Sequence, residues 1–137
     1  MTHFKLYHST TDLPESWDTL PVQDTFLKTP FLRALESSSP ANISTYFLGV
    51  FSSDTLVGIA IIQRVEMYFD DVFRKTSNQF FKRCGKILIS KIVKGNALIV
   101  GNLLHTGQHG LYFNTDYISQ DVFLDQVSDG LITLTKT

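Results

Sequence analysis

Two apolar runs stand close together in the sequence, Tyr46-Phe47-Leu48-Gly49-Val50-Phe51 and Val57-Gly58-Ile59-Ala60-Ile61-Ile62. They belong to longer segments, Ile43 to Phe51 and Leu56 to Tyr68, which are rich in β-branched and aromatic residues. Because Ser52-Ser53-Asp54 between them has the composition of a turn, we predict a β-hairpin. Both strands are apolar on both faces over much of their length, which predicts a central sheet covered by helices on its two sides.

On the N-terminal side of this hairpin, the sequence predicts a short strand and two helices. Phe4-Lys5-Leu6-Tyr7 alternates apolar and polar residues, as a strand does. A proline suits a first helical position, which predicts a short helix over Pro14 to Leu20. Thr29-Pro30 begins a second helix, and the apolar residues of the following segment, Phe31 to Glu36, share one face.

On the C-terminal side, apolar residues at helical spacing predict a helix from about Asp71 to Val93, ended by Gly95-Asn96. Ala97 to Val100 is predicted to be a buried strand. A glycine-containing loop, Gly101 to Gly110, follows it, and then a short strand over Leu111 to Phe113.

Ser119 is expected to cap a last helix. The apolar residues on one face of this helix are Phe123, Val127, Leu131 and Leu134. The resulting order, β-α-α-β-β-α-β-β-α, predicts an α+β fold with a mixed, largely antiparallel central sheet flanked by helices. A doubly wound parallel sheet is not expected from this order.

The chain has 137 residues, 43% apolar and 18% charged, which is typical of one globular domain spanning residues 1–137. Cys84 is the only cysteine, which excludes an internal disulfide and a cysteine-rich zinc site. The N-terminus shows no signal peptide, and no stretch approaches the roughly 20 apolar residues of a membrane span. We therefore expect a cytoplasmic protein.

Charge is unevenly distributed along the chain. Seven bases and no acid lie between Val72 and Thr115, whereas acids outnumber bases on either side. The predicted helix over about Asp71 to Lys94 is therefore basic and amphipathic, which is typical of a helix facing an anionic surface such as a membrane. A helix packed on a core with a solvated polar face has the same pattern, so both interpretations stay open. A nucleic-acid partner is not expected.

The glycine loop is the main candidate for a binding site, because glycines let backbone amides approach a phosphate or pyrophosphate closely. The alternative interpretation is a structural turn with glycines at positive φ, since the spacing matches neither common phosphate-binding motif. The candidate cofactor-binding residues are Gly101, Asn102, Thr106, Gly107, His109 and Gly110.

His105 and His109 lie four residues apart in the same loop, but no Asp or Glu lies nearby to complete a metal site, so no metal is expected. Cys84 is expected to be a buried small hydrophobe and Trp17 a core residue. Gln63, near a strand end, is a candidate for lining a pocket. No residue is identified as catalytic, because the chain has neither a GxSxG motif nor a suggestive pair of carboxylates.

Several segments together resemble the opening of bacterial GNAT-superfamily proteins related to the Fem-type (peptidoglycan) aminoacyltransferases. The resemblance spans Lys5 to about Leu131 and is one of pattern, without a catalytic motif. The segments that carry it are Phe26 to Glu36, Tyr46 to Phe51, Leu56 to Gln63, Gly95-Asn96, Gly101-Asn102 and Thr106 to Gly110.

The resemblance implies a GNAT-like domain that forms the N-terminal part of a longer acyltransferase, with the acyl-donor chemistry in later sequence. The superfamily's acetyl-CoA loop has the pattern Gln/Arg-x-x-Gly-x-Gly/Ala between the fourth strand and the next helix. His105 to Gly110 stands at that position and departs from the pattern. The partner that the resemblance implies for this domain is a C-terminal catalytic half. Because a missing half would expose a sheet edge, a second copy of the chain is the other expected partner.

Three functional interpretations follow. The first is the N-terminal domain of an acyltransferase, without a complete active site of its own. The second is a small, self-sufficient N-acyltransferase that binds acetyl-CoA or another acyl-CoA through the Gly101–Gly110 loop. The third is a non-enzymatic module that dimerises or binds an anionic surface through the basic helix.

Overall fold

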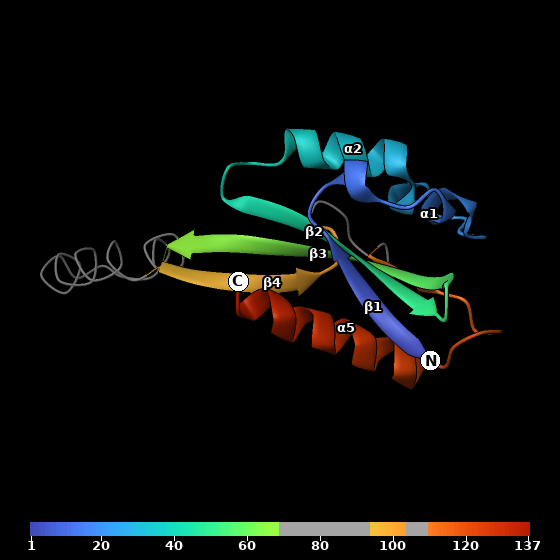
Figure 1. Ribbon diagram of the computed structural model, residues 1–137. Coiled ribbons are helices and arrows are strands. Elements are labelled where there is room, and N and C mark those ends of the chain that lie inside the picture. Colours follow the sequence, from blue (N-terminus) through green and yellow to red (C-terminus); the bar gives the residue numbers. More distant parts are fainter. Residues whose placement is uncertain (69–93, 104–109) are drawn as a thin grey trace, which may run out of the picture.

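The computed structural model describes residues 1–68, 94–103 and 110–137. Its elements follow the order expected for an α+β protein, and two short 3-10 helices, η1 and η2, stand beside the α-helices (Figure 1). The elements are β1 (Thr2–Tyr7), η1 (Thr10–Asp12), α1 (Ser16–Thr19), η2 (Thr25–Leu27), α2 (Thr29–Ser38), β2 (Ile43–Ser52), β3 (Thr55–Tyr68), β4 (Lys94–Val100), β5 (Leu111–Phe113) and α5 (Gln120–Thr135).

The strands of the described residues form one five-stranded sheet in which every pairing is antiparallel. β2 and β3 are joined by a tight turn in which Ser53 has a φ of 53°. All of β2 pairs with β3 between Thr55 and Val65, with Tyr46 opposite Ile62 and a register shift between Val50 and Phe51. The predicted hairpin is therefore confirmed, and so is the α+β class with a largely antiparallel central sheet.

β4 and β5 lie along the same side of β3. Val100, the last residue of β4, pairs with Ile62, and Leu111, the first residue of β5, pairs with Ala60. The two strands therefore form a single edge row opposite β3, interrupted at the level of Ile61. β1 forms the opposite edge, paired with β2.

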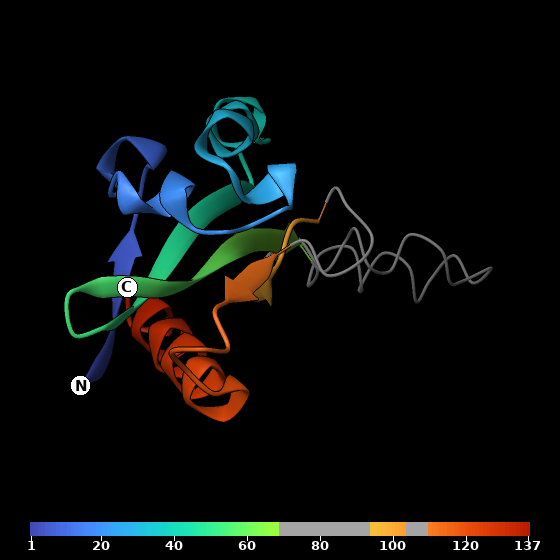
Figure 2. The same ribbon diagram turned by 90° about the vertical axis from the view of Figure 1, so that its right-hand side faces the viewer.

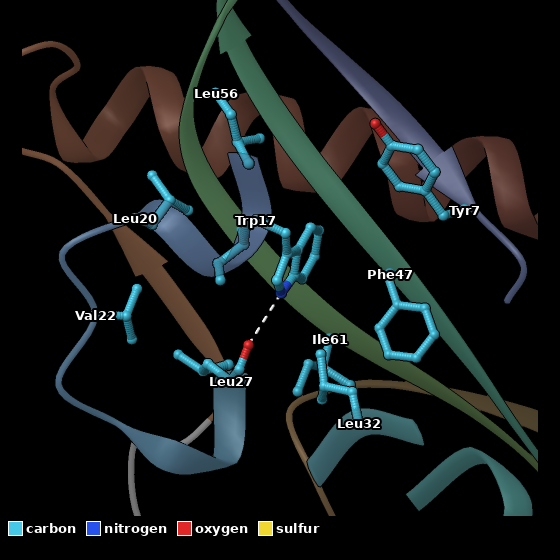
Figure 3. Packing of buried hydrophobic residues seen from close by; sticks show 10 residues of the cluster. Tyr7, Trp17, Leu20, Val22, Leu27, Leu32, Phe47, Leu56 and Ile61 are labelled. Atoms are coloured by element: carbon cyan, nitrogen blue, oxygen red, sulfur yellow. Dashed lines mark hydrogen bonds between the residues drawn. The ribbon is translucent and has the colours of Figure 1, made fainter. Parts of the chain in front are cut away.

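Helices cover both faces of the sheet, as predicted: α1 and α2 lie on one face and α5 on the other (Figures 1 and 2). On the α1 and α2 face, the fully buried Trp17 packs edge-on against Tyr7 and Phe47 (Figure 3). Its indole Nε1 donates a hydrogen bond of 2.9 Å to the carbonyl of Leu27. The expected core position of Trp17 is therefore confirmed, and its polar atom has a partner, as buried indoles need.

α5 packs on the opposite face through the apolar stripe read from the sequence. Phe123 is fully buried and stacks on Phe113 of β5, with ring centroids 4.9 Å apart. Gly130 lets the helix approach the sheet closely, because a Cβ there would lie 2.2 Å from Leu48 Cδ1. At the start of α5, the Ser119 hydroxyl accepts a hydrogen bond from the amide of Val122, which confirms the predicted cap.

The N-terminal helices are fastened to one another by side-chain caps. Asp18 of α1 accepts hydrogen bonds from the amide and the hydroxyl of Thr29, the first residue of α2. The Lys28 ammonium donates in return to the carbonyls of Asp18 and Leu20 at the end of α1. Three of these four bonds satisfy a backbone group at a helix end; the fourth joins the Thr29 hydroxyl to the Asp18 carboxylate.

Glu36 of α2 fastens the chain that leaves β1. Its carboxylate accepts hydrogen bonds from the amide and the hydroxyl of Thr10 in η1. Burial alone would raise the pKa of Glu36, but the Thr10 hydrogen bonds, with smaller contributions from Ser9 and Arg33, outweigh it and lower the pKa below its ordinary value of 4.5.

Three sequence-based boundaries need correction. α1 covers only Ser16–Thr19, because Leu20 already has an extended backbone. Gly95-Asn96, expected to end a helix, lies instead with Lys94 at the start of β4, since the three residues pair with Glu66-Met67-Tyr68 of β3. The strand Ala97–Val100 is half-buried rather than buried, because it lies at the sheet edge. Pairing with a long neighbour extended β4 beyond what residue propensity suggests.

Candidate functional site

The glycine loop leaves and rejoins the sheet at one residue of β3. The amide of Gly101 donates a 2.8 Å hydrogen bond to the carbonyl of Ile61, and the amide of Ile61 donates a 2.8 Å bond to the carbonyl of Gly110. Residues 101 and 110 thus meet opposite Ile61, where β4 ends and β5 is about to begin. The segment between them therefore interrupts what is otherwise a single edge strand, made of β4 and β5.

Both glycines at the base of this loop are required by its geometry. Gly101 has a φ of 128°, in the region that favours glycine. A Cβ on Gly110 would lie 2.2 Å from the Cα of Gly101, so no side chain fits there. Gly101 therefore has the positive φ that the structural interpretation expected, whereas Gly110 is required by lack of space.

Gln63 holds the first turn of the loop. Its side chain is 1% exposed, and its Oε1 accepts a 2.8 Å hydrogen bond from the amide of Leu103. Its Nε2 donates a longer bond of 3.4 Å to the hydroxyl of Thr45, which is also buried. Gln63 was expected near a strand end lining a pocket, but it lies within β3, between Thr45 of β2 and Ile99 of β4.

Sequence reasoning missed two residues of this arrangement. Thr45 was not singled out, although a polar residue in an apolar strand is a usable signal when a second one, Gln63, lies in the neighbouring strand. Ile61 carries no chemical signal, because only its backbone takes part. The register that places Ile61 opposite the loop ends is visible only in the folded sheet.

The other candidate residues divide between the described and undescribed parts of the chain. Asn102 is buried and follows Gly101 directly. Thr106, Gly107 and His109, together with His105, lie outside the described residues. The structure therefore brings Gly101, Asn102 and Gly110 together at the base of the loop.

Two backbone amides in the described part of the loop already donate hydrogen bonds within the chain. Gly101 N–H bonds to Ile61, and Leu103 N–H bonds to Gln63. The loop does not lead into a helix N-terminus either, because β5 and residues 114–119 stand between Gly110 and α5. The first turn of α5 has its own cap, in which Ser119 accepts from Val122.

The basic helix expected over about Asp71 to Lys94, with Cys84 in it, falls outside the described residues except for Lys94, which begins β4. Within residues 1–68, 94–103 and 110–137, no group of three or more His, Cys, Asp or Glu side chains is arranged to bind a metal. Of the four histidines, His3 stacks on Phe51 and His8 packs edge-on against Tyr46.

The described helices include none with the length and apolar character needed to cross a bilayer. Comparison of the chain with models of protein families, with curated proteins and with solved structures finds no match.

Proposed function

We propose that this chain is a GNAT-like domain forming the N-terminal part of a cytoplasmic acyltransferase, and that acyl-donor binding requires a C-terminal catalytic half. The resemblance of the sequence to Fem-type aminoacyltransferases suggests the family. The antiparallel sheet, which α1 and α2 cover on one face and α5 on the other, is compatible with it.

The observation that carries the incomplete-site part of this proposal is the closed base of the glycine loop. Binding of a CoA pyrophosphate by a loop needs backbone amides that are free to point at the anion. In this chain the amide of Gly101 donates a hydrogen bond to the Ile61 carbonyl, and the amide of Leu103 donates one to Gln63 Oε1. The described part of the loop therefore serves sheet closure, which supports a donor site provided by a second domain.

Titration of the isolated chain with acetyl-CoA tests this proposal. We expect no heat of binding by calorimetry and no thermal shift at millimolar ligand. A site with a Kd a hundredfold below the ligand concentration would stabilise the protein by about 2.7 kcal/mol, which a thermal shift detects easily. Micromolar binding would overturn the requirement for a second half.

The same titration decides the alternative of a self-sufficient acyl-CoA-dependent enzyme. In that case acetyl-CoA would stabilise the chain, and the stabilisation would be lost in Gly107→Val. The remaining alternative, a module that binds an anionic surface through the basic segment Asp71 to Lys94, predicts salt-sensitive binding to anionic vesicles and none to neutral ones.

A further inference from the structure

The outer edge of β4 has the composition of an interior strand. From Gly95 to Val100 it carries no charge, and Ala97, Leu98, Ile99 and Val100 are all half-buried. The register places Ile99 on the α1 and α2 face, opposite Gln63, and Leu98 on the α5 face, opposite Arg64. Apolar side chains on both faces are typical of a strand with neighbours on both sides.

The backbone of β4 alternates between the two sides. Because Gly101 N–H bonds to Ile61, the hydrogen-bonded partners of β3 in this row are the odd-numbered residues, which include Ala97 and Ile99. The even-numbered residues Asn96, Leu98 and Val100 therefore turn their N–H and C=O groups outward. Among the described residues, no strand pairs with this side of β4.

We infer that the outer edge of β4 pairs antiparallel with β4 of a second copy of the chain, about a two-fold axis at Leu98. Leu98 is the midpoint of the outward-facing residues Asn96, Leu98 and Val100. A two-fold axis there makes Leu98 a hydrogen-bonded pair with itself and pairs Asn96 with Val100 of the other copy, so every outward group finds a partner. The inference is independent of the proposed acyltransferase role.

The side chains of β4 complement one another in this register. Ala97 faces Ile99 of the second copy on the α1 and α2 face, which pairs a small residue with a large one. Leu98 faces Leu98 on the α5 face. This self-complementarity selects a second copy over an unrelated strand, which has no reason to match it.

The first test is the mass of the untagged full-length chain in solution. Light scattering at high micromolar concentration should give twice the 15.5 kDa of one chain. In Leu98→Lys two ammonium groups would face each other across the axis, so the dimer Kd should rise by about tenfold or more. A monomer at high micromolar concentration would overturn the inference.

Cysteine trapping tests the register, in a Cys84→Ser background that removes the native thiol. Leu98→Cys should form an inter-chain disulfide under mild oxidation, because hydrogen-bonded partners have Cα atoms about 5.5 Å apart, within disulfide reach. Asn96→Cys is the matched control on the same strand. Its two copies would lie about 13 Å apart along the paired strands, so it should not cross-link alone.

A mixture of the Asn96→Cys and Val100→Cys chains should cross-link as a heterodimer, since these residues are partners across the axis. A dimer in which Leu98→Cys fails to cross-link, or in which Asn96→Cys cross-links equally well, would refute β4 as the interface.

Hydrogen exchange on the unmodified chain gives a readout that does not depend on a variant folding. The amides of Asn96, Leu98 and Val100 should be protected at high protein concentration and exchange faster on dilution, whereas those of Ala97 and Ile99 stay protected by β3. Equal exchange of Leu98 at both concentrations would overturn the inference, because its N–H would then have no partner in the dimer.

Discussion

The two edges of the sheet are built differently. β1 is six residues long, alternates partly buried and exposed positions, and exposes His3 and Lys5. β4 carries no charge after its first residue, and it is apolar on both faces from Ala97 to Val100. Charged side chains on an edge discourage pairing with another strand. The comparison indicates that β1 is suited to remain an unpaired edge strand, whereas the residues of β4 are those of a strand paired on both sides.

The segments that follow the two edge strands are held by different types of side chain. The chain leaving β1 is fastened by a half-buried carboxylate, Glu36, which accepts from Thr10. The chain leaving β4 is fastened by a buried carboxamide, Gln63, which accepts from Leu103. Only the first contact involves a group that titrates in the acid range, so the two edges should respond differently to pH.

The largest expected effect concerns the packing beneath β1. Trp17→Ala removes the indole against which Tyr7, at the end of β1, packs edge-on. We expect the free energy of unfolding to fall by about 3–5 kcal/mol, as for other large aromatic truncations in cores. Urea denaturation followed by far-UV circular dichroism measures it, since Trp17 is the only fluorescent indole.

Trp17→Phe is the matched control, because it keeps a ring in the core but leaves the Leu27 carbonyl without its indole donor. It should cost less, about 1–3 kcal/mol. Equal losses in the two variants would mean that the hydrogen bond, and not the packing, fastens this side of the sheet.

The next effect concerns the closure of the loop at the other edge. Gly110→Ala would place a Cβ 2.2 Å from the Cα of Gly101, a backbone atom that cannot move aside freely. We expect a loss of about 3 kcal/mol in thermal or urea unfolding. Gly101→Ala is the matched variant that tests backbone conformation without a steric clash. Its Cβ would meet nothing within 4 Å, but the φ of Gly101 is 128°.

Gly101→Ala should therefore cost about 1–3 kcal/mol through backbone strain alone. If both alanine variants unfold like the unmodified chain, the loop ends do not meet opposite Ile61.

A smaller effect is expected for the carboxamide that fastens the β4 side. Gln63→Met keeps the length of the side chain but removes the acceptor of the Leu103 amide, at a cost of about 1–2 kcal/mol. Because neither group titrates, this cost should be the same at acid and neutral pH. Thr45→Val, which removes only the 3.4 Å contact, should cost less than Gln63→Met, and the reverse order would contradict the assigned role of Gln63.

The smallest effect concerns the carboxylate that fastens the β1 side. The pKa of Glu36 is lower in the folded chain than its ordinary value of 4.5. Its ionised form therefore stabilises the fold above that value, and the contribution is lost as the pH falls through the lowered pKa. Glu36→Gln should be less stable than the unmodified chain at neutral pH by less than about 1 kcal/mol, because solvent screens the site.

The stability difference between Glu36→Gln and the unmodified chain should shrink toward acid pH, as chemical unfolding at a series of pH values would measure. A difference that stays constant through the acid range would show that the Glu36 charge does not fasten η1.

Much of the fold was predictable from local patterns. The hairpin follows from two apolar runs around a turn, α5 from its Ser119 cap and apolar stripe, and α2 from Thr29-Pro30. The start of β4 was not predictable, because Lys94-Gly95-Asn96 has poor strand propensity and is extended only by pairing with the end of β3.

The candidate site was predictable only in part. The sequence identified Gly101, Gly110 and Gln63 as unusual, since glycines punctuate structure and a carboxamide is conspicuous in an apolar strand. Their common role was not visible, because it depends on Ile61, a residue far away in sequence whose backbone receives one loop end and donates to the other.

The sequence alone determined the class of the fold and its two covered faces, because the period of apolar residues and the turn and cap residues act over short stretches of chain. Tertiary structure decided which strands became edges, where the loop closed and which amides were already occupied. Those features depend on strand register, which is set by contacts between distant segments and flips every side chain when it slips by one residue.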